Sequence, residues 1–309
     1  MIIVKMLGGL GNQMFQVAYA LSLAEKYDRD VYLDLSIYDN YKIRSFSLDN
    51  LVLNERVSIL SDKELNRWQY TSMVLSQKIY HVFQKLLRLC GKDFKFGEYW
   101  FKKLSSKGYF YNFDNYYHEH EFQAEDDSNI YLYGYFQSER YFIDHLDNIR
   151  DLFSIKTSLN TSDILCSYRN QILSSERSIA ISMRLGKDYT SSKIFNVCDI
   201  SYFTNSLNYI LSREPNAVVF VFSDVVSEAK VILKDYENIV FVDGCKDFQS
   251  LELMSLCDHF IISNSSFSWW GAYLSEYDDK LIIAPDNWYN KIHGNVDIYN
   301  NSITKFSNL

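Results

Sequence analysis

The segment IIVKMLGGLGNQMFQVAYALSLAEKYDRDVYLDL, residues 2–35, predicts a strand, a turn, a helix and a second strand. Its apolar run at 2–6 ends in a turn that contains three glycines between positions 8 and 11. Asn12 follows as the expected N-cap of the helix, and residues 31–35 form the second strand. This pattern predicts a βαβ unit with a glycine turn at the carboxyl end of its first strand.

The second half of the chain repeats this alternation of strand and helix more regularly. Its apolar runs are continuous, which indicates strands that are buried on both faces of a parallel sheet. The predicted strands are 178–183, 217–222, 238–242, 259–262 and 280–284, with helices at 201–211, 226–235 and 248–257. We therefore expect an α/β protein with an N-terminal domain at 1–155, which carries a helical or irregular insert near 55–125, and a C-terminal domain at 156–309.

The composition excludes several classes of protein. Apolar residues make up 47% of the 309 positions and charged residues 23%, which is typical of a folded chain and not of a disordered one. The 39 acidic and 31 basic residues give a net charge of −8, which disfavours nucleic acid as a partner. Five cysteines without a Cys-x-x-Cys pair indicate reduced thiols in a cytoplasmic protein. No stretch approaches the roughly 18 apolar residues that span a bilayer.

One segment in the middle of the chain is basic. Residues 61–90 have the pattern of an amphipathic helix. Its expected apolar stripe comprises Val74, Ile79, Val82, Phe83, Leu86 and Leu87. The stretch 78–107 then carries eight basic residues against two acidic ones. Two interpretations stay open: peripheral contact with an anionic partner, such as the inner face of a membrane or an acceptor, and a solvated face that balances the acidic stretch 114–127.

The glycine turn is the first candidate binding site, since three of only 11 glycines fall within it. The dinucleotide fingerprint Gly-x-Gly-x-x-Gly fails because Met14 occupies the third glycine position, and no P-loop lysine follows. The turn instead offers backbone N–H groups and the amides of Asn12 and Gln13 at a helix N-terminus. Such a group suits an anion or a sugar hydroxyl. A plain strand-to-helix turn is the alternative.

Two strand ends in the second half carry charged side chains. Arg184 follows the strand 178–183, and its guanidinium fork suits a phosphate, although a surface ion pair is the alternative. Asp188 either orients this arginine or accepts a proton. Ser223 and Asp224 end the next strand, where Asp224 either holds a base or ribose or caps the following helix. Ligands of open α/β sheets bind at this carboxyl edge.

A serine-rich segment follows the strand 259–262 and opens a helix. Its residues are Asn264, Ser265, Ser266, Phe267 and Ser268, followed by Trp269 and Trp270. Three hydroxyls at a helix N-terminus suit phosphate ligands, because capping needs only one, and we expect at least one tryptophan to pack in the core. The three strand ends together indicate a nucleoside-diphosphate site. We expect no metal, because the six histidines show no ligand spacing.

Five motifs occur in order along the chain. They are GGLGNQMFQ at 8–16, YLYGYFQSERYF at 131–142, the Arg-x-Gly-Lys-Asp-Tyr loop at 184–189, VFSD at 221–224 and SNSSFSWWGAYL at 263–274. In this combination the chain resembles the bacterial α-1,2-fucosyltransferases of glycosyltransferase family 11. The resemblance covers nearly the whole chain apart from the insert, and its first and last motifs are highly specific.

The resemblance implies a GT-B fold, with two facing Rossmann-like domains and a cleft between them. It implies a galactoside α-1,2-fucosyltransferase that moves L-fucose from GDP-β-L-fucose to a galactose hydroxyl, with inversion and without metal or cofactor. The acceptor is then a galactose-containing oligosaccharide or lipid-linked glycan. Expected donor-binding residues are Gly11, Gln13, Arg184, Ser223, Asp224, Asn264, Ser265, Ser266, Phe267 and Ser268, and expected catalytic residues are Arg184, Asp188 and Asn12.

The loop at 184–189 departs from the family pattern His-x-Arg-Arg-Gly-Asp-Tyr. Ser182 replaces the histidine, Leu185 replaces the second arginine, and Lys187 is inserted before Asp188. Val225 stands where a second aspartate usually follows Ser-Asp. Two other functions therefore stay open: another GDP-sugar or protein O-fucosyl transfer, and a catalytically weak nucleotide-sugar-binding protein. The incomplete fingerprint disfavours a nicotinamide oxidoreductase.

Overall fold

The computed structural model describes residues 1–39, 44–61, 67–89, 102–112, 116–118, 129–145, 149–159, 162–290 and 296–308. The chain divides into two compact units. The first unit comprises Met1–Phe46 and Leu53–Asn148, and the second comprises Ser47–Val52 and Ile149–Leu309. A backbone hydrogen bond from Val52 to Ser154 ties the short segment to the second unit. No helix in the described ranges is long and apolar enough to cross a membrane.

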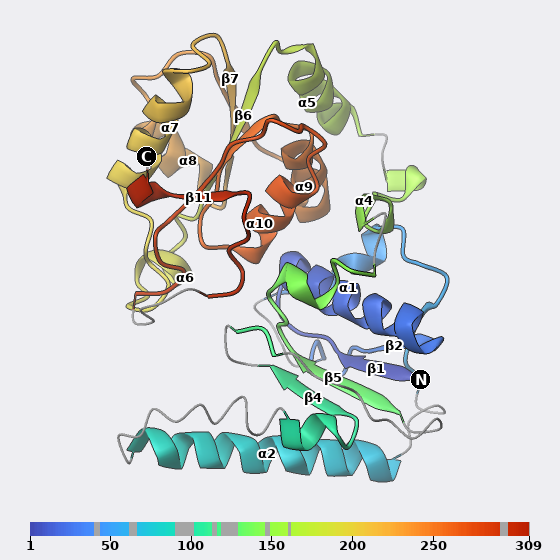
Figure 1. The fold of residues 1–309 in the computed structure, drawn as a ribbon. Coiled ribbons are helices and arrows are strands. Elements are labelled where there is room, and N and C mark those ends of the chain that lie inside the picture. Colours follow the sequence, from blue (N-terminus) through green and yellow to red (C-terminus); the bar gives the residue numbers. More distant parts are fainter. Residues whose placement is uncertain are drawn as a thin grey trace. The chain divides into compact units, whose positions relative to one another are not determined.

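Within its described residues, the first unit is built on a sheet of five parallel strands. Its elements are β1 (Ile2–Lys5), α1 (Leu10–Tyr27), β2 (Val31–Asp34), β3 (Val57–Ile59), α2 (Arg67–Leu89), β4 (Tyr109–Asn112) and β5 (Ile130–Gly134). The strand order is β3-β2-β1-β5-β4. Helix α1 lies over one face of the sheet and α2 lies along the other (Figure 1). The βαβ unit predicted from residues 2–35 is confirmed.

Apolar residues explain why α1 and α2 lie on the sheet. Nearly every residue of α1 from Leu10 to Ala24 is buried, because small and apolar side chains occur all around the helix. On the opposite face, Ile3, Tyr111 and Tyr131 form a cluster to which Val74 of α2 adds its side chain. The predicted helix at 61–90 is therefore present as α2, while residues 62–66 and 90 lie outside the described ranges.

The described part of the second unit contains a sheet of six parallel strands. Its strands are β6 (Ser178–Met183), β7 (Val218–Ser223), β8 (Ile239–Val242), β9 (His259–Ile261), β10 (Ile282–Ala284) and β11 (Ile303–Lys305). Its helices are α4 (Ile149–Leu152), α5 (Asp163–Ser174), α6 (Lys187–Thr190), α7 (Ile200–Leu211), α8 (Val226–Ile232), α9 (Asp247–Ser255) and α10 (Ser266–Tyr273). All five predicted strands are confirmed, and the predicted helices correspond to α7, α8 and α9.

The strands of this unit follow the order β8-β7-β6-β9-β10-β11, which is the 3-2-1-4-5-6 order of the Rossmann fold. One apolar cluster packs α7 and α8 against one face of the sheet. A second cluster packs α5, α9 and α10 against the other face. Both faces are therefore covered, as the continuous apolar runs predicted.

Each sheet reverses its strand order at its centre. In the first unit the reversal lies between the neighbours β1 and β5, and in the second between β6 and β9. Loops that leave two such strands diverge to opposite faces, so ligands of open α/β sheets bind at this point. Each unit therefore has its own candidate binding position, at the carboxyl ends of β1 and β5 in the first unit and at those of β6 and β9 in the second.

Candidate functional site

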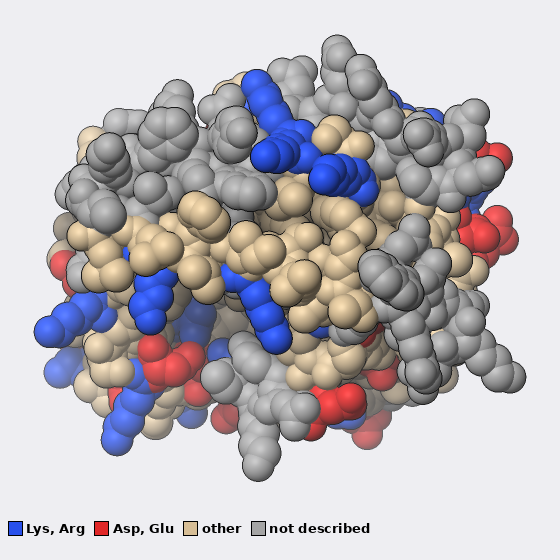
Figure 2. All heavy atoms as spheres, turned by 90° about the horizontal axis from the view of Figure 1, so that it is seen from below, with Lys and Arg blue, Asp and Glu red and all other residues tan. Residues whose placement is uncertain are grey.

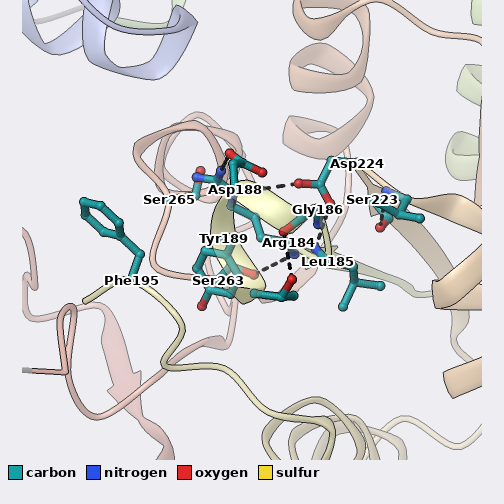
Figure 3. Close-up of polar contacts among 12 residues, drawn as sticks. Arg184, Leu185, Gly186, Asp188, Tyr189, Phe195, Ser223, Asp224, Ser263 and Ser265 are labelled. Atoms are coloured by element: carbon teal, nitrogen blue, oxygen red, sulfur yellow. Dashed lines mark hydrogen bonds and ion pairs between the residues drawn. The ribbon is translucent and has the colours of Figure 1, made fainter. Parts of the chain in front are cut away.

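Arg184 leaves the carboxyl end of β6 at the centre of the second sheet. Its Nη2 donates to Asp188 Oδ2 at 2.9 Å, and its Nε lies 3.9 Å from Asp224 Oδ2 (Figure 3). The backbone N–H of Arg184 donates to Ser263 Oγ at 3.3 Å, which links the loops that follow β6 and β9. The arginine side chain is 28% exposed. A partly accessible guanidinium is thus held between the carboxylates of Asp188 and Asp224.

Asp224 reaches from the end of β7 to the loop after β6. Its Oδ1 accepts hydrogen bonds from the backbone N–H groups of Leu185 and Gly186, at 2.7 and 3.1 Å. Helix α8 begins after Val225 without a side-chain cap, so the predicted capping role of Asp224 is wrong. The carboxylate binds the neighbouring loop because the N–H groups of Leu185 and Gly186 follow the end of β6 and point toward it.

Gly186 lets the loop pass between the two carboxylates. A Cβ atom at this position would lie 2.7 Å from Asp188 Oδ1 and 3.0 Å from Asp224 Oδ2. Any larger residue would therefore displace the carboxylates that hold Arg184. Leu185, which stands at the position of the family's second arginine, packs its side chain against the core cluster of α7 and α8.

A buried tyrosine joins this loop to the serine-rich segment. The hydroxyl of Tyr189 donates to Asn264 Oδ1 at 2.6 Å and accepts from the backbone N–H groups of Val197 and Cys198. Tyr189 is 1% exposed, and burial raises the pKa of its phenol, which keeps the donating proton in place. Burial also raises the pKa of the Cys198 thiol to about 11. These groups are therefore neutral structural partners at physiological pH.

The serine-rich segment divides into buried and accessible residues, which the sequence did not distinguish. Asn264 is buried, and its Nδ2 donates to the carbonyls of Phe195 and Trp288 while its Oδ1 binds Tyr189. Ser268 is fully buried and donates to carbonyls within its own turn. Both side chains therefore hold the loop and the first turn of α10 through hydrogen bonds within the protein.

Ser265, Ser266 and Phe267 stay partly accessible at the start of α10. Ser265 occupies the N-cap position without a capping hydrogen bond from its side chain. Trp269 and Trp270 are both buried, so the expectation of core packing holds for both. Ser223, at the end of β7, is half-buried, and its Oγ accepts from the backbone N–H of Val225.

The glycine turn of the first unit begins directly after β1. Gly8 has φ +81°, and a Cβ there would lie 2.5 Å from Asn12 Nδ2. Gly9 is the N-cap of α1, and Asn12 lies inside the first helical turn, so the predicted capping role of Asn12 is wrong. Its Oδ1 instead accepts from Gln137 Nε2 at 2.7 Å. This bond joins the loops that follow β1 and β5.

Gln13 and Gly11 are the expected donor-binding residues of the glycine turn, and both are buried. Gln13 is fully buried, and its Nε2 has three acceptors within 3.0 Å, the carbonyls of Gly8 and Ser45 and the hydroxyl of Tyr38. Gly11 is buried in the first turn of α1. The Gln13 side chain therefore ties the glycine turn to the segment that contains Tyr38 and Ser45.

Gln137 is a site residue that sequence reasoning did not single out. It belongs to the quoted motif 131–142, but only the parallel pairing of β1 with β5 places it beside Asn12. Its position just past a strand end was the available signal. Among the described residues, no three His, Cys, Asp or Glu side chains are grouped to hold a metal ion.

Comparisons with known proteins agree with this architecture. The family model of Glycosyl transferase family 11 matches residues 1–302. An α-1,2-colitosyltransferase of Escherichia coli is 31% identical over 306 residues, which cover 94% of this chain and 93% of the relative. The O-antigen biosynthesis glycosyltransferase WbnK of Escherichia coli is 28% identical, over 91% of this chain and 93% of the relative.

Solved structures show the same fold at low identity. The fucosyltransferase NodZ from Bradyrhizobium superimposes with a TM-score of 0.53 at 13% identity, over 89% of this chain and 93% of that chain. FUT1 of Arabidopsis thaliana in complex with GDP gives a TM-score of 0.53 at 13% identity, over 93% of this chain and 71% of that chain. The expected α/β class with two Rossmann-like units of GT-B type is confirmed.

Proposed function

The chain belongs to glycosyl transferase family 11, and from that premise we propose that it transfers L-fucose from GDP-β-L-fucose to a galactose hydroxyl in α-1,2 linkage. The observation that carries this proposal is the placement of Arg184 between Asp188 and Asp224 at the strand-order reversal of the second sheet. A partly exposed guanidinium at this point suits a diphosphate.

The donor side of the proposal rests on three accessible groups. Arg184 offers its fork to the diphosphate, and the start of α10, with Ser265 and Ser266, offers backbone N–H groups and hydroxyls to the same charge. Asp224 is anchored through Oδ1, so its position is fixed before a nucleotide arrives. Arg184 and the start of α10 stabilise the departing GDP without a metal ion, because the charge that develops on the leaving diphosphate meets preorganised donors.

The acceptor side of the proposal rests on the amide pair of the first unit. Asn12 and Gln137 are uncharged and hydrogen-bonded to each other, and amides both donate to and accept from sugar hydroxyls. The acceptor hydroxyl attacks the anomeric carbon from the face opposite the diphosphate while the bond from that carbon to the diphosphate oxygen breaks, which inverts the configuration, and the hydroxyl proton passes to water. Asp188 already holds Arg184, so we assign it the orienting role and give Asn12 the role of positioning the hydroxyl.

A donor panel tests this function directly. Thermal unfolding is followed with GDP, GDP-fucose, GDP-mannose and UDP, each with and without a chelator, and transfer of labelled fucose to a galactoside is measured in parallel. We expect stabilisation by the guanosine compounds, and transfer that the chelator does not change. Stabilisation by UDP and not by GDP would overturn the proposal, and binding without transfer to any galactoside would leave a nucleotide-sugar-binding protein.

A second donor is favoured by the similarity to the colitosyltransferase. Colitose is fucose without its 3-hydroxyl group, so one site can accept both sugars unless it binds that hydroxyl. The ratio of kcat/KM for GDP-fucose and GDP-colitose separates the two. A site that binds the 3-hydroxyl prefers fucose by about 10⁴-fold or more, whereas a site without that contact discriminates weakly or favours colitose. The similarity to WbnK extends the proposal to a galactose residue of an O-antigen type glycan as acceptor.

A further inference from the structure

Helix α2 exposes a row of large apolar side chains along its length. The exposed fractions are 58% for Leu75, 43% for Ile79, 57% for Val82, 51% for Leu86 and 77% for Leu89. Their spacing of four, three, four and three residues places them on one side of the helix. These five residues are called the α2 stripe below. Such a continuous apolar surface on a folded protein indicates a contact with something else.

The α2 stripe lies on a different side of the helix from the residue that packs on the sheet. Val74 of α2 is partly buried and packs with the cluster on the sheet face. On a helical wheel the centre of the stripe, near Leu75, lies about 100° from Val74. The packing of the helix on its own unit therefore leaves the stripe uncovered by the described part of this unit.

The charge of α2 is unlike that of the rest of the chain. Residues 67–89 contain no aspartate or glutamate, although the whole protein has 39 acidic residues and a net charge of −8. Lys78 and Lys85 are exposed and lie seven residues apart, so both border the same edge of the stripe. No described carboxylate forms an ion pair with either. Seen from the α2 side, lysine and arginine side chains border a broad band of uncharged surface (Figure 2).

Charge complementarity decides which partner fits this surface. If two copies paired through the stripe as a coiled coil, with Ile79 and Leu86 at a positions, Lys78 and Lys85 would occupy g positions. No acidic residue of a partner α2 would face them, and an antiparallel pair would place lysine beside lysine. An anionic bilayer supplies both an apolar layer for the stripe and negative headgroups for the lysines.

We propose that α2 is a membrane-surface anchor, which lies in the plane of an anionic lipid bilayer with the α2 stripe inserted at the headgroup boundary. The inference selects one of the two interpretations of the basic segment. The acidic stretch 114–127, which the other interpretation requires, lies mostly outside the described residues. The proposal is independent of the donor and acceptor assigned above, because it uses no residue of either half-site.

Vesicle flotation of the full chain tests this proposal. The vesicles are phosphatidylcholine alone and an equimolar mixture of phosphatidylcholine and phosphatidylglycerol, at low and at high salt. We expect binding to the mixed vesicles, weakened by salt, and little binding to phosphatidylcholine. Leu86→Glu lowers the partition coefficient about tenfold or more, since it removes apolar burial and adds a repelled charge. Lys78→Gln and Lys85→Gln each lower it about fivefold.

A matched variant controls for surface hydrophobicity and net charge. Val231 of α8 is 69% exposed, and Val231→Glu makes the same kind of change on a helix outside the stripe. We expect it to bind vesicles as the wild type does, and all variants to keep the wild-type stabilisation by GDP, which shows that they are folded. Equal binding of Leu86→Glu and wild type would overturn the proposal. So would a wild-type dimer in sedimentation velocity that Leu86→Glu dissociates, with no vesicle binding by either protein.

Discussion

The two parallel sheets reverse their strand order in the same way but present different side chains at the reversal. In the first unit, the neutral amides of Asn12 and Gln137 meet across the ends of β1 and β5. In the second unit, Arg184 lies between two carboxylates, and its backbone meets Ser263 across the ends of β6 and β9. The topology provides the place for a ligand in both units, and the residue types at the strand ends choose its chemistry.

The comparison extends to the buried residue that holds each reversal in place. Gln13 fixes the glycine turn of the first unit through Gly8, Tyr38 and Ser45. Tyr189 fixes the arginine loop of the second unit through one donated and two accepted hydrogen bonds. In both units, buried polar groups support the accessible ones, which is what a precise ligand geometry requires. We assign the donor to the second unit and the acceptor to the first.

The largest expected effect comes from the arginine of the second unit. Arg184→Ala removes the cation that meets the leaving diphosphate, and we expect kcat/KM for fucosyl transfer to fall about 100- to 1,000-fold. Arg184→Lys retains only part of the wild-type kcat/KM, because an ammonium group lacks the bidentate fork of the guanidinium. Arg213→Ala, which removes an exposed arginine of the same unit, is the control and keeps wild-type kinetics. Undiminished turnover of Arg184→Ala would contradict the donor assignment.

The second largest effect is expected when the hydrogen bond between the two amides of the first unit is removed. Gln137→Leu leaves Asn12 without its partner, and we expect kcat/KM for the acceptor to fall about tenfold to 100-fold through lost positioning. GDP binding stays at the wild-type level, because no residue of the second unit changes. Initial rates at varied acceptor, together with GDP-induced thermal shifts, measure both quantities. A loss of GDP binding with unchanged acceptor kinetics would contradict the assignment of the acceptor to the first unit.

A smaller effect is expected on protein stability when Tyr189 or Gln13, the buried residues that hold the two loops, is substituted. Tyr189→Phe leaves Asn264 Oδ1 and the backbone N–H groups of Val197 and Cys198 without their shared partner, and we expect a loss of about 1–3 kcal/mol in the free energy of unfolding. Gln13→Leu removes a fully buried donor from three acceptors, and we expect a similar loss. Urea unfolding of both variants makes the measurement. A neutral Gln13→Leu would show that the turn keeps its shape without this residue.

The smallest effect is a pH dependence confined to the second unit. Burial lowers the pKa of His259 below its ordinary value of 6.5, against the opposing charges of Asp258 and Glu214. Its Nδ1 accepts the backbone N–H of Leu281, so the folded state favours the neutral ring. The unfolded chain then binds the extra proton first, and stability falls as the pH drops below about 6.5.

Urea midpoints above and below that pH measure this dependence, and His259→Gln is expected to flatten it. If the urea midpoint of the variant still changes with pH as in the wild type, another titrating group causes the pH dependence.

Much of this architecture follows from local sequence pattern, and the rest depends on long-range pairing. The strands β6 to β10 were predicted because they are continuous apolar runs. The strands β4 and β5 were not, because they are short and rich in tyrosine, and tyrosines of the two strands stack across the pair, as Tyr109 and Tyr131 do. A local rule offers helix capping as one of two roles for Asp224, whereas the fold brings it to backbone N–H groups 38 and 39 residues away.

The candidate site shows the same division. Arg184, Asp188 and the serine-rich segment could be identified from their positions after predicted strands. Burial then separated Asn264 and Ser268 from Ser265 and Ser266, and no sequence pattern contains that information. The bond between Asn12 and Gln137 joins residues 125 positions apart, and it exists because β1 pairs with β5.

Calorimetric titration of GDP into three proteins, the wild type, Arg184→Ala and Asn12→Ala, tests the central assignment most directly. The account predicts that Arg184→Ala loses at least about tenfold in GDP affinity, since charge-assisted bonds to a phosphate contribute about 1.5–3 kcal/mol. It predicts that Asn12→Ala binds GDP as the wild type does. Equal GDP affinity in Arg184→Ala and wild type, or loss of GDP binding in Asn12→Ala, would contradict the division of donor and acceptor between the two units.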